Sequence, residues 1–395
     1  MKPSFRNPKS AIRNKQVIAF GVIGFILLVV LPLLNILPAE GAWYHISNYR
    51  LNLFGKFLCY AIVALGIDLI WGYTGILSLG HGVYFALGGY CMGMYLMLVI
   101  GKAGVYGSEL PDFMVFLNWT KLPWYWPPFR HAWFMPIAVI LVPGIFATIF
   151  GFLTFRSRIR GVYFAIITQA LTYALALLFF RNNIGLGGNN GLTDFKRILG
   201  FPLDQQNTMR GLYIITVLCL GGAYLLCRWI TASKLGRVLV AIRDNENRVR
   251  FAGYSPARFK LFGFVVSAIL AGIAGALYVP QVGIINPSEL EIGPSLEMVI
   301  WVAVGGRGTL VGAALGAFVV NWSKSLLTGS TIFSQVWPYL LGGLFLGVVM
   351  FIPEGLVGLP RRLSGLFRRF RATDEKKSKW AAGEQIGESK IDHCK

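Results

Sequence analysis

Residues 136–154 read PIAVILVPGIFATIFGFLT and contain no charged side chain. The hydrocarbon core of a bilayer is crossed by a helix of about 20 apolar residues, and this stretch is close to that length. Similar runs recur along the 395 residues, of which 55% are hydrophobic and only 14% charged, with a mean hydropathy of +0.60. The sequence therefore predicts an all-α integral membrane protein and excludes a soluble globular domain.

Ten apolar segments can be marked on the chain. They lie at about 17–37, 53–70, 76–100, 136–154, 161–180, 211–230, 261–280, 296–304, 309–327 and 337–352. The first is expected to be a retained helix, because no small-residue cleavage pattern follows it. The segment at 296–304 is too short to span alone, which indicates broken or re-entrant helices. We expect 1–16 to be a basic tail, 17–359 the membrane domain and 360–395 a basic, disordered tail.

Basic residues cluster in four places that the positive-inside rule assigns to the cytoplasm. These are the N-terminal tail, the stretch 156–160, the stretch 228–260 and the sequence RRLSGLFRRFR from Arg361. Even numbers of apolar segments separate them, so both termini are predicted to be cytoplasmic. The rule also accounts for the net charge of +20 without nucleic acid as a partner. The tryptophan-rich loop 101–135 is expected to lie along the opposite membrane surface.

Known catalytic and metal-binding patterns are missing from the sequence. The five cysteines have no CxxC spacing, and the four histidines are scattered. A GxxxxGK[ST] phosphate loop, an HExxH motif and a GxSxG elbow are also missing. The chain is therefore predicted to hold no metal and no cofactor, and to have no ATPase site of its own.

Residues 233–260, SKLGRVLVAIRDNENRVRFAGYSPARFK, form a dense polar and basic stretch between two apolar segments. Val238, Ile242, Val249 and Ala252 recur at helical spacing, which predicts an amphipathic helix of two to three turns. On a cytoplasmic face such a helix can dock a soluble partner, although a solvated basic face that only follows topology is the alternative. Its candidate contact residues are Gly236, Arg237, Arg243, Asp244, Glu246, Arg248, Arg250 and Gly253.

Two stretches, 68–90 and 292–316, combine glycine with hydroxyl and ionisable residues at membrane depth. Non-helical backbone at that depth must be buried in protein or line a watery cavity. Both stretches are therefore candidates for a translocation path. The candidate path residues are Asp68, Thr74, Ser78, His81, Asn286, Glu297 and Arg307.

Structural interpretations stand beside these functional ones. Asp68 and His81 either serve the path or hydrogen-bond backbone that a broken helix has freed. Glu297 and Arg307 flank the short segment and are expected to pair with each other. Two lysines near span ends, at positions 56 and 324, are expected to extend toward the membrane surface.

Four stretches resemble the branched-chain amino-acid and urea permease family of ABC importers. They are SLGHGVYFALGGY at 78–90, GRVLVAIRDNENRVRFAGY at 236–254, SAILAGIAGALYVPQVGIINPSE at 267–289 and EMVIWVAVGGRGTLVGA at 297–313. The likeness runs from about Leu51 to Leu359. Within the family, WGYTGILSLGHG at 71–82, NNGLTDFK at 189–196 and YVPQVGIINPSE at 278–289 are most similar to one of the two permease subunits of the bacterial urea importer.

The resemblance implies a half-transporter in the bacterial cytoplasmic (inner) membrane. Its implied partners are membrane lipid, a second related permease, two cytoplasmic ATPase subunits that bind ATP and Mg, and an extracytoplasmic solute-binding protein. The 233–260 loop would couple to an ATPase, with Arg243, Arg248 and Arg250 bound to acidic groups of its groove. Gly253 would end the helix in a left-handed conformation. The implied cargo is urea, which is neutral and needs only carbonyls, hydroxyls and amides.

Other functions remain open on the sequence. A branched-chain amino-acid permease keeps the class and changes the cargo. A stand-alone channel or ion-coupled transporter would work without an ATPase, and a membrane scaffold would leave the broken polar segments without a purpose.

Overall fold

The computed structural model describes residues 21–24, 26–36, 46–157, 159, 161–329, 331–351 and 355–358, so the predicted tails lie outside the described residues. The helices are α2 (Leu31–Ile36), α3 (Asn48–Thr74), α4 (His81–Ile100), α5 (Asp112–Phe116), α6 (Phe134–Arg156), α7 (Val162–Phe179), α8 (Gln206–Ala232), α9 (Lys234–Phe251), α10 (Pro256–Val282), α11 (Ile292–Gly305), α12 (Leu310–Leu327) and α13 (Thr331–Phe351). Short helical turns are η1 (Ile26–Val30), η2 (Gly101–Ala103), η3 (Pro127–Arg130), η4 (Asn182–Ile184), η5 (Gly188–Asn190) and η6 (Pro287–Leu290). The strands are β1 (Leu192–Thr193), β2 (Arg197–Ile198), β3 (Phe201–Pro202) and β4 (Ile284–Ile285).

Seven helices in the described part of the chain are long and apolar enough to cross a membrane. They are α3, α4 with η2, α6, α7, α8, α10 and α12. Shorter apolar helical stretches occur at 21–36, in α11 and within α13, which together match the ten predicted segments. α11 has 14 residues and is roughly 21 Å long at 1.5 Å per residue, less than the roughly 30 Å of a hydrocarbon core. The predicted all-α membrane architecture with a short segment is confirmed.

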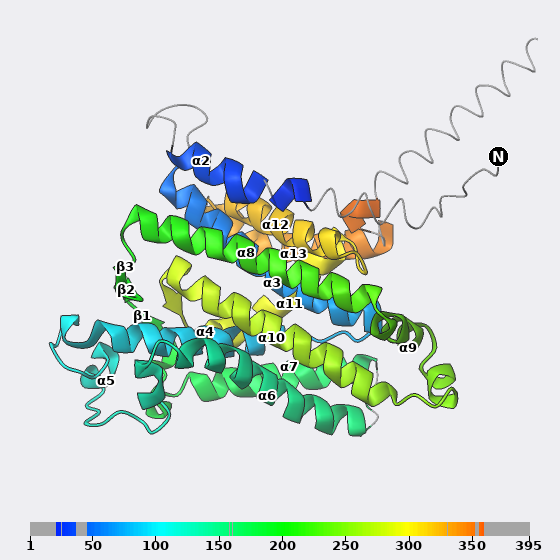
Figure 1. Cartoon of the computed structure of the whole chain (residues 1–395), viewed down its shortest axis with the longest axis horizontal. Coiled ribbons are helices and arrows are strands. Elements are labelled where there is room, and N and C mark those ends of the chain that lie inside the picture. Colours follow the sequence, from blue (N-terminus) through cyan, green and yellow to red (C-terminus); the bar gives the residue numbers. More distant parts are fainter. Residues whose placement is uncertain are drawn as a thin grey trace, which may run out of the picture.

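The long helices lie side by side along the horizontal axis of Figure 1, with α10 packed against α3, α4 and α6. Glycine allows the closest of these contacts, because a Cβ on Gly88 of α4 would lie 2.0 Å from the Gly272 oxygen of α10. A Cβ on Gly275 would lie 1.8 Å from the Phe85 oxygen. Small residues at these positions let the two backbones touch, as in other membrane helix pairs.

The bundle has two distinct ends. α9 lies at the right of Figure 1, together with the end of α3 and the connection between α6 and α7. Arg156 of the predicted basic cluster at 156–160 and the cluster at 228–260 thus lie at the same end, as the predicted topology requires. α5 and the short strands lie at the left.

Loops that are distant in sequence meet at the left end. β1 pairs with β4 in antiparallel register, with Leu192 opposite Ile285. The loop 101–135 packs on the segment that begins at η4, and the Trp126 indole donates to the Gly185 oxygen at 3.1 Å. Trp126 is completely buried in this contact, whereas Trp124 and Trp133 are exposed. The placement of this loop along the membrane surface stays a prediction.

The backbone leaves helical structure inside the bundle at the two predicted places. α3 ends at Gly75, and the chain runs through 75–80 without helix before α4 begins at His81. His81 contacts Ser267, which lies roughly 16 Å along α10 from its first residue. α11 likewise begins inside the fold, since the Gly82 N–H donates to the Ser295 hydroxyl at 3.1 Å. The two helices that follow the breaks thus begin next to fully buried residues, His81 and Ser295, where irregular backbone is covered by protein.

Candidate functional site

The predicted amphipathic helix is α9, and it consists of two pieces. Ser233 caps its start by accepting hydrogen bonds from the Leu235 and Gly236 N–H groups. Asn245 interrupts it with φ −158° and ψ 95°, and the Asn245 side chain accepts from the Arg248 N–H at 3.1 Å, which caps the second piece.

The interruption changes which side chains face the bundle. The buried positions of α9 are Gly236, Leu239, Ile242 and Val249. Val238 is only half-buried and Ala252 is exposed, so the predicted apolar stripe is wrong at these two positions. A continuous period was assumed across Asn245, where the helix turns out to be broken.

The two predicted glycines of this segment have different roles. A Cβ on Gly236 would lie 2.3 Å from the Thr231 oxygen, so only glycine fits between α8 and α9. Gly253 has φ +85°, and the next N–H, of Tyr254, donates to the Val249 oxygen at 3.3 Å. Gly253 thus adopts the left-handed conformation after the end of α9, as predicted.

Arg243 reaches from α9 to the end of α3. Its Nη1 donates to the Gly72 oxygen near the end of α3 at 2.7 Å, and its Nε contacts Asp244 at 3.1 Å. A Cβ on Gly75 would lie 2.9 Å from Arg243 Cγ, so the turn after α3 also rests on this side chain. Arg243 therefore fixes α9 to the point where α3 stops.

A second contact holds the far part of α9. Lys260 on α10 donates to Glu246 at 2.7 Å, and Arg250 donates to the other oxygen of Glu246 at 3.1 Å. The Lys260 side chain is only 9% exposed. A cavity of about 430 Å³ adjoins this group and is lined by Phe155, Arg156, Ile159, Glu246, Arg250, Tyr254, Ser255, Pro256, Ala257 and Lys260. Sequence reasoning missed Lys260, whose only signal was its place at the start of an apolar segment.

The remaining charged side chains of α9 face away from the bundle. Arg237 and Arg248 are exposed, and the Asp244 side chain is 64% exposed. These three residues are accessible to a partner at this end of the bundle.

The loop between α11 and α12 lies against the same end of α3. Asp68 is fully buried, and its Oδ1 accepts a hydrogen bond from the Gly308 N–H at 2.6 Å. Arg307 donates to the Trp71 oxygen at 3.2 Å, and its guanidinium lies 5.2 Å from the Trp71 ring centroid. Asp68 therefore bonds backbone freed at a break, which was the structural interpretation.

Glu297 pairs with Lys324 and not with Arg307. Lys324 Nζ contacts the two Glu297 oxygens at 3.1 and 2.8 Å. The prediction of a Glu297–Arg307 pair is wrong, because the residues stand at opposite parts of α11, separated by roughly 15 Å of helix.

The other predicted path residues are distributed along the bundle. Thr74 donates to the Ile70 oxygen within α3, and Ser78 accepts from the Gly80 N–H at 3.4 Å. His81 Nε2 and the Ser267 hydroxyl are 2.8 Å apart. Asn286 follows β4, and its Cα lies 2.6 Å from where a Cβ on Gly191 would be. The seven predicted residues thus do not form one site.

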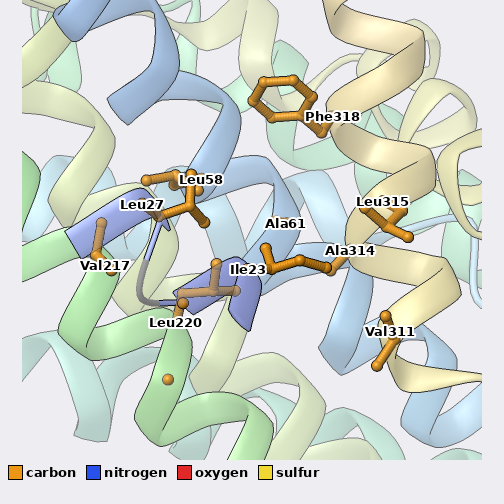
Figure 2. A pocket seen from close by; sticks show the side chains of 12 residues that line it. Ile23, Leu27, Leu58, Ala61, Val217, Leu220, Val311, Ala314, Leu315 and Phe318 are labelled. Atoms are coloured by element: carbon orange, nitrogen blue, oxygen red, sulfur yellow. The ribbon is translucent and has the colours of Figure 1, made fainter. Parts of the chain in front are cut away.

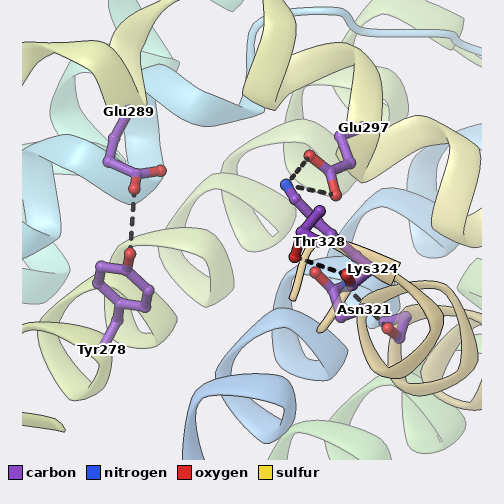
Figure 3. A network of polar contacts seen from close by, with 7 residues as sticks. Tyr278, Glu289, Glu297, Asn321, Lys324 and Thr328 are labelled. Atoms are coloured by element: carbon purple, nitrogen blue, oxygen red, sulfur yellow. Dashed lines mark hydrogen bonds and ion pairs between the residues drawn. The ribbon is translucent and has the colours of Figure 1, made fainter. Parts of the chain in front are cut away.

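Polar side chains do gather toward the left end of the bundle, in a group that we call the Lys56 cluster. Its members are Lys56, Tyr60, Tyr278, Glu289, Glu297 and Lys324. Figure 3 shows Tyr278 donating to Glu289, at 3.1 Å, and Lys324 between the oxygens of Glu297. Lys56 thus lies over two rings and Lys324 pairs with Glu297, while their extension toward the membrane surface stays a prediction. The signal for Lys56 was a cation within the apolar run 53–70.

An apolar groove of about 200 Å³ lies between α3, α8, α12 and the segment around η1 (Figure 2). It is lined by Ile23, Gly24, Leu27, Leu58, Ala61, Val217, Leu220, Gly221, Val311, Ala314, Leu315 and Phe318. None of these side chains offers a hydrogen-bond donor or acceptor. The groove therefore suits hydrocarbon and not a polar solute.

Known proteins with related sequences support a common class. A family model described as the permease component of branched-chain amino acid transport systems matches residues 49–352. The Escherichia coli high-affinity branched-chain amino acid transport system permease protein LivM is 24% identical over 386 residues, covering 91% of this chain and 82% of the relative. BraD of Pseudomonas aeruginosa, named with the same function, is 22% identical over 80% of this chain and 97% of its own length. LivH of Salmonella typhimurium is 23% identical over 76% of this chain and 92% of its own length. No solved structure was found to match the chain.

Proposed function

The chain belongs to the branched-chain amino acid transport permease family, and on that premise we propose that it carries a branched-chain amino acid across the membrane in an ATP-driven importer. It is a multi-pass permease of the inner membrane without an ATPase site of its own. The urea cargo that motif resemblance implied finds no support among the relatives, whose names specify branched-chain amino acids. The amino-acid alternative therefore replaces it.

The proposed assembly contains two permease subunits, two ATPase subunits and an extracytoplasmic binding protein. ABC importers work with ATPase and binding-protein partners, and the numbers of each are part of the proposal. ATP and Mg would be bound by the ATPase subunits.

Coupling is proposed to pass through α9, and the observation that carries this proposal is the Arg243 contact with the Gly72 oxygen. A partner that displaces α9 would move the end of α3 through this bond. Because Asp68, one turn earlier on α3, holds Gly308, the loop between α11 and α12 would move with it. Ligand-driven motions are transmitted through such chains of packed and hydrogen-bonded groups.

The partner's contacts are proposed to involve the exposed side chains of α9. Arg237 and Arg248 supply positive charge for an acidic groove, and Asp244 supplies one negative charge. Arg243 and Glu246, which sequence analysis grouped with them, instead hold α9 to α3 and α10 in this structure.

Transport by reconstituted proteoliposomes tests the proposal. Vesicles that contain the chain, its second permease, the ATPases and the binding protein should accumulate labelled leucine only when ATP is present on the ATPase side. Labelled urea is offered in parallel, and accumulation of urea in place of leucine would identify the urea importer.

Two controls separate the other classes. A stand-alone channel or ion-coupled transporter would move solute with this chain alone, whereas the proposal expects no uptake from such vesicles. A scaffold would support no uptake in either preparation.

A further inference from the structure

Lys56 is a half-buried cation of the Lys56 cluster, and no carboxylate of the described residues lies within ion-pair distance of it. It lies on α3, roughly 12 Å along the helix from Asn48, between the rings of Tyr60 and Tyr278. Its ammonium is 5.8 and 5.6 Å from the two ring centroids. Aromatic faces attract a cation but replace only part of its lost hydration.

Glu289 is a carboxylate with only one of its oxygens hydrogen-bonded to a described residue. One of its carboxylate oxygens accepts a hydrogen bond from the Tyr278 hydroxyl at 3.1 Å, and no partner for the other oxygen occurs among the described residues. η6, which carries Glu289, belongs to the segment that turns back into the fold after α10. The half-buried carboxylate is thus held at a break by one hydrogen bond from a described residue.

The neighbouring charges are already neutralised. Lys324 contacts both oxygens of Glu297, as Figure 3 shows, so this pair cancels within itself. The cluster as a whole contains two cations and two carboxylates. What remains after the closed pair is one cation and one carboxylate: Lys56 lies over the ring of Tyr278, and Glu289 accepts from the hydroxyl of the same tyrosine.

Ionisable groups inside a membrane domain are costly and are retained where they act on a substrate or ion. An amino acid presents one carboxylate and one ammonium on the same carbon, which complements an unpaired cation and an unpaired carboxylate. A neutral solute such as urea complements neither. The Tyr60 ring is 4.6 Å from the Trp301 ring, and the buried Trp301 indole N–H has no acceptor among the described residues.

We propose that Lys56 and Glu289 form a binding site in the membrane domain for the carboxylate and ammonium groups of an amino-acid cargo. Lys56 binds the carboxylate, Glu289 binds the ammonium, and Tyr60 with Tyr278 forms the wall between them. The inference rests on the proposed function, because it deepens the amino-acid cargo to the residues that recognise its charges. By contrast, Lys260 and Glu246 at the α9 end of the bundle form a closed pair with a 2.7 Å contact.

Binding of labelled leucine to the complete importer in lipid nanodiscs tests the proposal. The comparison is made without nucleotide between the unchanged importer, Lys56→Gln and Glu289→Gln. Lys102→Gln and Glu109→Gln, two exposed residues of the loop after α4, are the matched controls. Lys56→Arg keeps the positive charge and tests whether charge alone restores binding.

We expect both cluster substitutions to reduce saturable leucine binding at least tenfold, with the controls unchanged and Lys56→Arg keeping most of the binding. The thermal unfolding midpoint and the stoichiometry of the purified complex identify any variant that fails to fold. For such a variant, the binding measurement is replaced by modification of Lys56→Cys with a charged thiol reagent. Leucine is expected to slow this modification.

Different failures have different meanings. The unchanged importer could accumulate leucine while the folded Lys56→Gln and Glu289→Gln variants bind it normally. In that case the Lys56–Glu289 binding site is refuted and the proposed function stands. If the unchanged importer accumulates urea and not leucine, both are refuted, because urea has no charges for the two residues to bind. If Lys56→Arg loses binding as completely as Lys56→Gln, recognition by charge is refuted.

Discussion

Three charged side chains near α9 bind main-chain atoms, whereas those of the Lys56 cluster at the other end of the bundle meet side chains. Arg243 donates to the Gly72 oxygen, Arg307 donates to the Trp71 oxygen, and Asp68 accepts from the Gly308 N–H. Glu289 accepts from the Tyr278 hydroxyl, and Lys324 pairs with Glu297. The first arrangement fixes the backbone of helix ends, so that they move together. The second leaves Lys56 and Glu289 without an ion-pair partner among the described residues, so that both can bind a ligand.

This difference separates two kinds of polar residue in one membrane domain. A side chain that binds backbone at a break replaces the hydrogen bonds that the missing helix would have made. A half-buried charge such as Lys56 or Glu289, which has no ion-pair partner among the described residues, is available to a charged ligand. The contrast between the two ends can be tested by breaking each kind of contact.

The largest effect is expected for Asp68→Ala. It removes the acceptor of the Gly308 N–H from a fully buried position, and loss of a charged hydrogen bond that leaves a buried partner unsatisfied costs about 2–3 kcal/mol. We expect a lower unfolding midpoint and at least a tenfold loss of ATP-driven leucine uptake. Asp204→Ala, at an exposed position, is the control and should behave as the unchanged protein. Full uptake by Asp68→Ala would show that the α11–α12 loop does not need this contact.

Arg243→Ala should affect coupling more than stability. The guanidinium joins α9 to α3, so its removal should lower leucine uptake about tenfold, equivalent to about 1.4 kcal/mol, while ATP hydrolysis by the assembled importer continues. The measurement is the number of leucine molecules imported per ATP hydrolysed. Arg258→Ala, exposed at the start of α10, serves as the control. If Arg243→Ala instead prevents the ATPase from copurifying, Arg243 acts as a docking residue and not as the link to α3.

Gly253→Ala should have a moderate effect, confined to the end of α9. Its φ of +85° is a conformation that costs a residue with a Cβ about 1–2 kcal/mol, although the space around it is open. We expect a small decrease in the unfolding midpoint and a partial loss of coupling. Asparagine tolerates this conformation better, so Gly253→Asn should recover part of the loss. Equal behaviour of the alanine and asparagine variants would argue against backbone strain as the cause.

Glu297→Gln should have the smallest effect on stability. The pair that it breaks is closed, but the Lys324 side chain is 39% exposed, and such pairs contribute about 1 kcal/mol or less. The unfolding midpoint at low and high salt measures this contribution, and Glu291→Gln in the same segment is the exposed control. A loss of leucine binding as large as that expected for Lys56→Gln would contradict the division between the closed pair and the open charges.

The fold was largely predictable because each relevant signal is local. Long apolar runs such as 136–154 identify spanning helices without reference to their neighbours, and the glycine-rich stretches at 68–90 and 292–316 identify the breaks. The end of α9 was predictable for the same reason, since Gly253 supplies a conformation that other residues rarely adopt. The interruption at Asn245 was missed because its neighbours continue the helical period.

The candidate site was much less predictable. Asp68 and Gly308 are 240 positions apart in the chain, and no periodicity or spacing relates them. From the sequence, Lys324 was expected to extend toward the membrane surface and Glu297 to pair with Arg307. The second expectation failed because proximity in sequence is a poor guide to contacts between helices. Only the packing of α11 against α12 brings Glu297 to Lys324.

The sequence by itself determined the number of apolar segments, the end of the bundle at which basic residues gather, and the two places where helices break. These properties follow from hydropathy, charge and backbone preference, which each residue carries with it. The tertiary structure decided which charges are closed pairs, which hold backbone and which remain open, since pairing depends on distances between side chains of different helices. Lys56 shows the limit most clearly: the sequence marks a cation inside an apolar run, and only the surrounding helices show Tyr60 and Tyr278 beside it in place of a carboxylate.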